Sequence, residues 1–288
     1  METILRVCPA DDLQAVLDNA PENACILLSE GIYRQKLLLR TNGLRLIGAG
    51  RDQTVLIWDD HARKRHPLGY EFNTFRTYTL AICADDVLLQ DLTVANDALQ
   101  PEVKGQEVAL SVLGDGFRME NCRLRSTQDT LFAGPLPDDL IGRYEGFLLD
   151  PLRRGGQLRQ RYENCLIEGT VDFIFGCGEA LFENCEIRSL CDARNIGYVA
   201  APAHELRQET GYRFHRCRFT CEAGVAPGSI YLARPWRDHG MCHFESCTYG
   251  PHIAPAGFDK WSGTHRDQTA RFFESPAVPG RVSWVNRR

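Results

Sequence analysis

The sequence predicts an all-β fold: a solenoid of short parallel strands, known as a parallel β-helix, with one short helix capping its amino-terminal end. Two observations support this prediction. Apolar runs of four or five residues alternate with Gly, Asn and Asp, with no helical segment between them. One short pattern also recurs along most of the chain, as the coils of a solenoid require. We expect a single domain over residues 1–288.

The predicted helix lies near the start of the chain. Residues 9–20 carry apolar side chains at helical spacing, and either Asp11 or Asp12 is placed to cap the helix. We expect this helix to cover an open end of the core. The apolar runs that follow it predict strands at residues 25–28, 36–39, 44–47 and 55–57.

The repeat becomes visible in the middle of the chain. Six copies align on one position, at intervals of 30, 43, 20, 32 and 30 residues; the aligned residues are Leu92, Cys122, Cys165, Cys185, Cys217 and Cys247. The fixed leucine spacing of a leucine-rich repeat is absent, so a β-helix is favoured. In that fold Asn121, Asn164 and Asn184 stack at one bend, and the cysteines that follow them point inward.

The interval of 43 residues is one coil of about 20 residues plus an excursion of about 23. Residues 135–157, which are rich in Pro, Gly and charged residues, are the predicted excursion. Asp129 lies seven residues after Cys122, and Asp172 lies seven residues after Cys165. With the excursion set aside, these two carboxylates become neighbours on successive coils, about 5 Å apart.

The surroundings of Asp172 indicate a catalytic role. Its neighbours Val171, Phe173, Ile174 and Phe175 are apolar, and an ionised carboxylate is costly to bury without a cation or donors. Two adjacent carboxylates have their pKa values pushed apart, which yields one acid and one base.

The same register also yields Asp192, seven residues after Cys185. The composition of the loop around it predicts an exposed turn residue. Repeat position alone therefore does not predict a catalytic residue.

Four other side chains could serve this pair. Arg234 and Trp236 are two residues apart, hence on one side of an extended strand, where arginine can hold a carboxylate and tryptophan can face a sugar ring. A surface arginine and a core tryptophan would explain the same residues. Gln106 and Gln128 can donate amide hydrogens to an oxyanion, although each alone is more often structural.

Composition and missing motifs exclude several classes. The chain has 33 basic and 38 acidic residues, a net charge of −5, which does not suggest a nucleic-acid partner. No apolar run is long enough to span a membrane. Neither Gly-x-Ser-x-Gly nor a metal-binding Cys-x-x-Cys or His-Glu-x-x-His is present. Residues 59–66 predict a solvated loop; the alternative is that their cations contact an acidic polymer.

The cellular location is a separate expectation. The first residues lack a basic segment followed by an apolar one, so we expect a cytoplasmic protein, or a secreted one if a leader precedes this sequence. The twelve cysteines are dispersed at strand-like positions, which favours reduced thiols in the core.

The sequence resembles the pectin methylesterase family (pectinesterases), whose fold is a right-handed parallel β-helix. The resemblance spans roughly residues 5 to 280, and the matching blocks occur in the family's order. These blocks are Gly31-Ile-Tyr33, Gly48-Ala-Gly50, Gly105-Gln-Glu-Val-Ala-Leu110, Gln128-Asp-Thr-Leu131, Gly169-Thr-Val-Asp-Phe-Ile-Phe-Gly176, Leu232-Ala-Arg-Pro-Trp236, Pro255-Ala-Gly-Phe-Asp-Lys-Trp261 and Phe272-Phe-Glu274.

The resemblance implies a role for each candidate residue. Asp172 would attack the methyl-ester carbonyl of a galacturonate, and Asp129 would protonate the departing methanol and then activate water. Gln106 and Gln128 would form the oxyanion hole, while Arg234 would orient Asp172. The implied substrate-binding residues are Trp236, Phe175, Val171 and Thr77. No metal and no organic cofactor is implied.

Three positions depart from the family pattern. Gln35 replaces a glutamate, Ala233 replaces a glycine, and Glu107 replaces an alanine. None of these changes removes a reacting group. If the Glu107 side chain faces the cleft, its charge would disfavour de-esterified sugars.

The leading hypothesis is therefore a pectinesterase acting on methylated galacturonan or oligogalacturonides, with no nucleic-acid or membrane partner and as a monomer. One alternative is a paralogue that cleaves another ester or a thioester. Another is a non-catalytic carbohydrate-binding β-helix, which would not need the Gln, Asp and Arg set.

Overall fold

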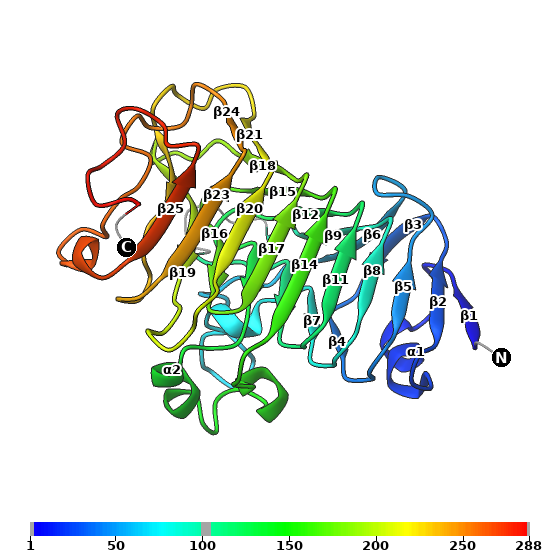
Figure 1. Cartoon of the computed structure of the whole chain (residues 1–288). Coiled ribbons are helices and arrows are strands. Elements are labelled where there is room, and N and C mark those ends of the chain that lie inside the picture. The colour runs from blue at the N-terminus through cyan, green and yellow to red at the C-terminus, as the bar shows by residue number, and fades with distance from the viewer. Residues whose placement is uncertain (1–2, 99–104, 287–288) are drawn as a thin grey trace.

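The computed structural model describes residues 3–98 and 105–286, and in this part of the chain the strands form three parallel sheets that wind into one coil (Figure 1). The ten-stranded sheet contains, in spatial order, β1 (Ile4–Val7), β2 (Cys25–Leu28), β5 (Arg45–Ile47), β8 (Leu88–Gln90), β11 (Phe117–Glu120), β14 (Arg159–Glu163), β17 (Glu179–Glu183), β20 (Tyr212–His215), β23 (Met241–Glu245) and β25 (Arg271–Ser275).

Two further sheets complete the coil. The seven-stranded sheet contains β22 (Ile230–Ala233), β19 (Gly197–Pro202), β16 (Val171–Gly176), β13 (Leu131–Ala133), β10 (Leu110–Val112), β7 (Leu80–Ile82) and β4 (Leu37–Leu39). The eight-stranded sheet contains β24 (Thr248–Tyr249), β21 (Arg218–Cys221), β18 (Glu186–Ser189), β15 (Leu166–Gly169), β12 (Arg123–Arg125), β9 (Thr93–Asn96), β6 (Thr54–Trp58) and β3 (Gly31–Arg34). The predicted parallel β-helix is confirmed.

The strand register reproduces the sequence repeat. Strand β11 pairs with β14 at an offset of 43 residues, and β14 pairs with β17 at an offset of 20, as Phe117 opposite Gln160 and Arg159 opposite Glu179 show. The other intervals, 30 and 32 residues, recur in the pairs β8–β11, β17–β20 and β20–β23. Each interval between aligned cysteines therefore measures one coil plus whatever loop that coil carries.

The helix α1 (Leu13–Asn19) caps the amino-terminal end of the coil, as predicted. The Asp12 carboxylate accepts a hydrogen bond from the Ala15 N–H at 3.0 Å, so Asp12 is the residue that caps it. The Gln35 amide accepts from Leu13 N–H at 2.9 Å and donates to the Asp11 carbonyl at 2.8 Å. An ionised glutamate could not make the second bond, which gives this departure from the family pattern a physical reason.

The Asn-Cys pairs mark the same bend in three successive coils. Asn121, Asn164 and Asn184 have φ angles of 51°, 54° and 52°, in the left-handed region that asparagine tolerates better than most residues. Their backbone N–H groups bond to the next coil, and the cysteines that follow them are buried. The bend thus turns each chain segment from the ten-stranded sheet into the eight-stranded sheet.

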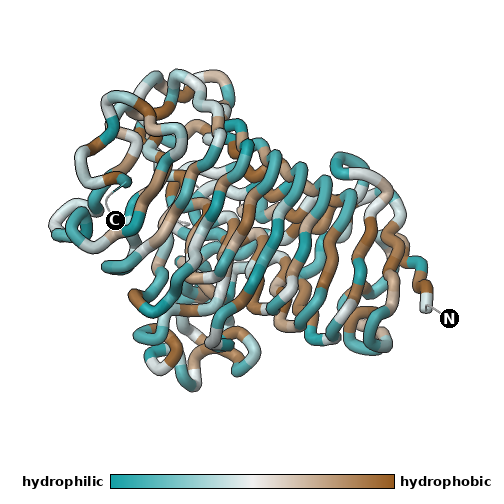
Figure 2. The backbone as a smooth tube through the Cα atoms, viewed as in Figure 1, coloured by the Kyte–Doolittle hydropathy of each residue, from teal (hydrophilic) through white to brown (hydrophobic). Residues whose placement is uncertain are grey.

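The interior of the coil is stacked in register. Brown and teal segments both occur along the ten-stranded sheet (Figure 2). In β14 and β23 every second residue is buried, so alternate side chains face the interior. Tyr162, Phe182, Phe214 and Phe244 occupy successive coils, and each ring lies 4.7 Å from the next in a near-parallel stack. Such pairs contribute about 0.5–1.5 kcal/mol each beyond the area that they bury.

The segment between β13 and β14 leaves the coil and contains two short helices, α2 (Asp138–Arg143) and η2 (Asp150–Arg153). It projects to the side of the coil (Figure 1). Its leucines 136, 140, 148 and 152 are buried with Phe132 and Phe175 in a second apolar cluster, outside the main core. This cluster lies on the outer face of the seven-stranded sheet. Two other short helices, η1 (Thr74–Arg76) and η3 (Arg266–Gln268), also lie in loops, and no described helix is long and apolar enough to cross a membrane.

Candidate active site

Two carboxylates meet on the outer face of the seven-stranded sheet. Asp129 lies just before β13 and Asp172 is the second residue of β16. Since Leu131 is paired with Ile174, the two aspartates are neighbours on adjacent coils, about 5 Å apart. The Asp129 N–H donates to the Val171 carbonyl at 3.1 Å, which fixes the two segments together. The predicted juxtaposition is therefore present.

Both aspartates have unusual backbone conformations. Their φ angles are 66° for Asp129 and 50° for Asp172, and the pairing of β16 with β19 is irregular between Val171 and Ile174. Residues in this left-handed region cost conformational energy and are often found at functional sites. The turn also needs Gly169, because a Cβ there would lie 2.2 Å from the Cβ of Phe173. This local geometry holds both carboxyl groups at the outer face, although each residue is only 7–8% exposed.

Arg234, which follows β22, holds Asp172. Its Nε donates to Oδ1 at 2.8 Å and its Nη2 donates to Oδ2 at 2.6 Å, a bidentate pair. The guanidinium lies between two rings, 3.8 Å from the centre of Tyr198 and 4.1 Å from that of Trp261. Contacts with the two rings restrict the guanidinium and help to fix the orientation of the carboxylate.

The environment separates the two carboxyl groups. Burial raises the pKa of Asp129 well above its usual value of 3.8, and the negative charge of Asp172 raises it further. Burial also raises the pKa of Asp172, but the hydrogen bonds and charge of Arg234 oppose that rise. This difference favours the proton on Asp129 and the negative charge on Asp172.

A third acid and a second arginine border the site. Asp192 binds Arg194 through Nε at 2.6 Å and Nη2 at 2.5 Å, and Arg194 Nη1 donates to the Gln128 side-chain oxygen at 3.4 Å. The charge of Arg194 lowers the pKa of both Asp129 and Asp172. The prediction of an exposed turn for Asp192 was wrong in part: it lies in a loop, but its side chain is only 16% exposed because it holds Arg194.

The two glutamines lie on neighbouring coils. The Gln128 carbonyl accepts from Glu107 N–H at 3.0 Å, and a hydrogen bond from the Gln128 side chain lowers the pKa of Asp129. Gln106 is half-buried, and its carbonyl accepts from Ala62 N–H at 2.8 Å. Both segments are therefore anchored through the backbone beside the aspartates.

The Glu107 side chain does not face the cleft. It is 1% exposed, and it accepts hydrogen bonds from the N–H and the hydroxyl of Thr127. The condition under which its charge would disfavour de-esterified sugars is not met.

The predicted substrate-binding residues divide into three groups. Phe175 and Trp236 meet edge to face, with centroids 5.8 Å apart, next to the aspartates. Val171 is 3% exposed and contributes its carbonyl to the Asp129 segment. Thr77 is fully buried, and its hydroxyl donates to the Thr74 carbonyl while accepting from Val108 N–H. Thr77 therefore supports the loop and is not available to substrate, which corrects that prediction.

Sequence reasoning missed Arg194, Tyr198 and Trp261 as parts of the site. Tyr198 could have been found from the register, because it pairs with Val171 on one side and with Tyr231 on the other. No spacing pointed to Arg194 or Trp261, which lie in loops. Within the described residues no group of three or more His, Cys, Asp or Glu side chains is placed to hold a metal ion.

Comparisons with known proteins agree with this fold. A family model described as Pectinesterase matches residues 8–135 and 155–287. Pectinesterase 31 of Arabidopsis thaliana is 32% identical over 289 residues, which cover 94% of this chain and 82% of that protein. Among solved structures, the pectin methylesterase PemA from Erwinia chrysanthemi superposes with a TM-score of 0.79 and 26% identity, covering 97% of this chain and 91% of the other. A pectin methylesterase in complex with a hexasaccharide gives a TM-score of 0.80 and 26% identity, with coverage of 98% and 92%.

Proposed function

The chain belongs to the pectinesterase family and is a carboxylic ester hydrolase, and we propose that it removes methyl esters from galacturonate units of pectin or its oligosaccharides. The observation that carries the proposal is the pair of buried aspartates, of which one is held by Arg234 and the other keeps its proton. The hexasaccharide bound to a similar pectin methylesterase supports an oligosaccharide substrate.

In the proposed first step a carboxylate oxygen of Asp172 attacks the ester carbonyl. The carbonyl oxygen takes the negative charge, and the Gln106 and Gln128 amides donate hydrogen bonds to it. As the carbon–oxygen bond to the methoxy group breaks, Asp129 gives its proton to the leaving oxygen, so that neutral methanol departs. An acyl anhydride then joins the galacturonate to Asp172.

The second step reverses these roles. Asp129, now ionised, takes a proton from water, and the water oxygen attacks the carbonyl of the galacturonate. Breaking the anhydride returns the Asp172 carboxylate to Arg234 and leaves a galacturonic acid, which ionises in solution. Each carboxyl group ends in the protonation state in which it began, as a catalytic cycle requires.

The aromatic residues beside the aspartates suit a sugar polymer. Trp236 offers apolar surface next to the ester and is packed against the buried Phe175, and Arg234 is withdrawn from solvent by Tyr198 and Trp261. A low-polarity site strengthens the hydrogen bonds and ion pairs that act on the reacting atoms.

The function is tested by incubating the protein with a fully methylated oligogalacturonide. We expect methanol and free carboxyl groups to appear in equal amounts, measured by methanol assay and by titration at constant pH. An oligomer esterified with acetate on its hydroxyls serves as the control and should release no acetate. A folded, β-rich protein that releases no methanol from any chain length would overturn the proposal.

The pH profile of kcat/KM is expected to be a bell. Activity rises with pH as Asp172 ionises and is lost as pH passes through the raised pKa of Asp129, because the leaving methoxy group then has no proton donor. The two groups titrate as a coupled pair, so both limbs report apparent values.

Removing the charge of Arg194 with Arg194→Gln should move both limbs to higher pH, by about 0.5–1 unit, because this charge lowers both pKa values. Arg218→Gln, an exposed change on the eight-stranded sheet, is the control and should leave the limbs in place. If both limbs of the pH profile stay at the same pH in Arg194→Gln, the charge of Arg194 does not affect the pKa values of Asp129 and Asp172, which we call the dyad.

A further inference from the structure

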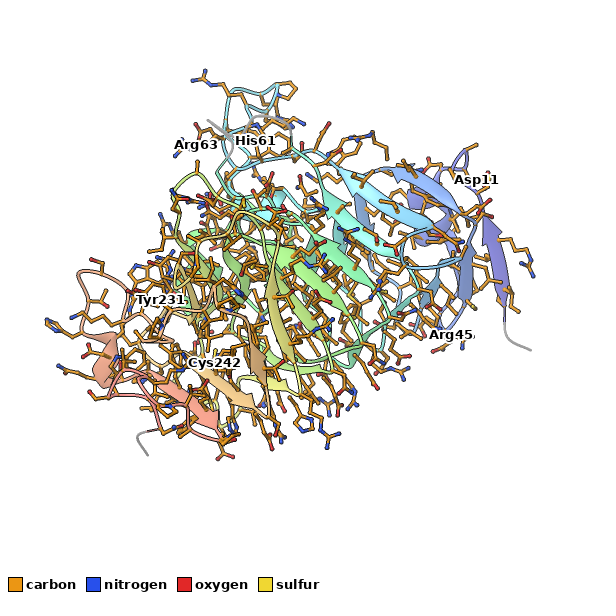
Figure 3. All side chains as sticks on the ribbon, turned by 90° about the horizontal axis from the view of Figure 1, so that it is seen from above. Asp11, Arg45, His61, Arg63, Tyr231 and Cys242 are labelled. Carbon is orange, nitrogen blue, oxygen red and sulfur yellow. The ribbon has the colours of Figure 1, made fainter. Side chains whose placement is uncertain are left out.

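The excursion contacts the segment that carries Trp236. The family model matches residues 8–135 and 155–287, so helix α2 lies in a part of the chain that family membership does not account for. The Trp236 segment leaves the coil after β22, whose Tyr231 is labelled in Figure 3. Asp139 in α2 and Arg237 beside Trp236 join the two segments, although they are 98 residues apart in the sequence.

The contact between Asp139 and Arg237 is a bidentate ion pair. Arg237 Nε donates to Oδ1 of the aspartate at 3.1 Å, and Nη2 donates to Oδ2 at 2.8 Å. Two parallel hydrogen bonds between planar groups set the orientation of the guanidinium as well as its distance. The excursion therefore determines where the Arg237 side chain lies.

The same guanidinium also holds Trp236. Its third nitrogen, Nη1, donates to the Trp236 carbonyl at 2.9 Å, and its central carbon lies 4.6 Å from the centre of the indole ring. A cation at this distance is attracted to the face of an aromatic ring. Asp139 thus acts on the indole through Arg237, because it fixes the cation against which the ring packs.

The indole ring also contacts the aspartate site. It meets the ring of Phe175 edge to face, with centroids 5.8 Å apart, and Phe175 lies in β16 with Asp172. The Trp236 N–H donates to the Pro202 carbonyl at 2.9 Å, which ties its backbone to the coil. The position of the indole therefore depends on two side chains of different origin, Phe175 from the coil and Arg237, which the excursion orients.

Asp138, the residue before Asp139, offers a matched comparison. Both aspartates lie in the first turn of α2, and both tie the excursion to a loop of the coil. Asp138 Oδ2 lies 2.8 Å from Nη2 of Arg207, whose Nε lies 2.6 Å from Glu205. Of the two aspartates, Asp139 is the one whose arginine contacts Trp236, so the pair separates attachment of the excursion from positioning of the indole.

We propose that Asp139 and Arg237 are positioning residues for the esterase reaction, through which the excursion holds the Trp236 indole against the sugar that carries the methyl ester. This inference rests on the proposed function, because it gives Trp236 a sugar ring as its partner. Neither residue takes part in the chemical step. The effect of losing them therefore falls on substrate binding and not on the rate of the bound complex.

The test compares Asp139→Asn with Asp138→Asn in the whole chain. Each change removes one charge from the same helix turn and keeps the size of the side chain. We expect Asp139→Asn to raise the KM for a methylated oligogalacturonide about three- to fivefold while kcat stays within about twofold. Asp138→Asn should change neither constant by more than about twofold. Asp139→Glu, which keeps the carboxylate, should restore most of the lost affinity.

A double-mutant cycle tests the route through Arg237. Arg237→Gln should raise KM at least as much as Asp139→Asn, because it removes the contacts with Trp236 directly. In the Arg237→Gln background the further change Asp139→Asn should have no effect on KM beyond about 1.5-fold. If the two increases instead multiply in the double variant, Asp139 does not act through Arg237 and the inference is wrong.

Trp236 can also be observed without any substrate. The chain has four tryptophans, so fluorine NMR of protein labelled with fluorotryptophan gives few signals, and Trp236→Phe identifies the one from Trp236. Asp139→Asn should shift or broaden this signal, whereas Asp138→Asn should leave it in place. A merely structural role of the ion pair would change the stability of the protein without this difference between the two variants.

Equal increases in KM for Asp139→Asn and Asp138→Asn would overturn the inference, because attachment of the excursion would then explain both. An unaltered Trp236 signal, or a loss confined to kcat, would also overturn it. The two proposals can fail separately. A Trp236 signal that responds to Asp139→Asn in a chain that releases no methanol would reject the esterase and keep the link from Asp139 to Trp236. Methanol release with an unaltered KM and signal would do the reverse.

Discussion

Replacing Asp172 with asparagine is expected to lower the kcat for methyl-ester hydrolysis by about four orders of magnitude or more. An amide oxygen is a poor nucleophile, so the covalent intermediate does not form. Asparagine keeps the size of the side chain and can still accept one hydrogen bond from Arg234, so the site should keep its shape. The measurement is methanol release under single-turnover conditions, with substrate binding by calorimetry to show that the ligand still enters.

The control for this prediction is Asp52→Asn, which removes a carboxylate that is 74% exposed. It should not alter the rate. Trapping provides a second test: hydroxylamine added during turnover should convert the acyl intermediate to a hydroxamate in the natural sequence but not in Asp172→Asn. A variant that releases methanol at the unaltered rate would remove Asp172 from the role of nucleophile.

The repeat made the position of Asp172 predictable before any coordinates. In a β-helix each coil returns to the same bend, so residues at equal distances from that bend lie side by side. The seven residues from Cys122 to Asp129 and from Cys165 to Asp172 therefore indicated contact, and the pairing of Leu131 with Ile174 places them so. The excursion lengthened the interval to 43 residues but did not change the register, because it leaves the coil and rejoins it at the next strand.

The limits of that reasoning lie in the loops. Arg194 approaches the dyad because Asp192 holds it, and Trp261 covers Arg234 from a segment 27 residues further along the chain, past the last aligned repeat. No periodicity constrains either position. The prediction that Thr77 binds substrate was wrong for a related reason. The sequence cannot distinguish a threonine that faces the cleft from one whose hydroxyl forms hydrogen bonds with the backbone.

The charged run at residues 59–66 was ambiguous for the same physical reason. Two acids followed by basic residues are typical of a solvated loop, and only the folded chain shows Lys64 and Arg65 lining a cavity with Arg76 and Phe147. The monomeric state and the cytoplasmic location stay predictions, because they depend on partners and processing.

The second large effect is expected from Arg234→Met, which should lower the free energy of unfolding at neutral pH by about 3–5 kcal/mol. Methionine keeps much of the side chain's length but leaves the buried Asp172 carboxylate without its two hydrogen bonds and its cation. Urea unfolding followed by circular dichroism measures the change. The free energy of unfolding of Arg234→Lys should lie between those of the natural sequence and Arg234→Met. Lysine restores the charge but not the bidentate geometry or the stacking against Tyr198 and Trp261.

The sign of the pH dependence distinguishes a lost ion pair from a lost packing contact. Without Arg234 nothing comparable opposes the effect of burial, so the pKa of Asp172 in the folded state should rise further above its unfolded value. A folded carboxyl with a raised pKa binds a proton that the unfolded chain has released. The contribution of this protonation to the stability of the folded state is complete below the pKa of the unfolded chain, and it is lost as pH rises through the pKa of the folded state. Arg234→Met should therefore be least destabilised in acid and increasingly destabilised toward neutral pH.

A double-mutant cycle completes this argument. Adding Asp172→Asn to Arg234→Met removes the stranded charge, so the double variant should recover a large part of the lost stability at pH 7 and lose the pH dependence of the single variant. If stability falls equally at every pH, and the second substitution restores nothing, then Arg234 acts through its packing between Tyr198 and Trp261. In that case the carboxylate would not need the arginine to stay ionised, and the assignment of Asp172 as the charged member of the dyad would lose its physical basis.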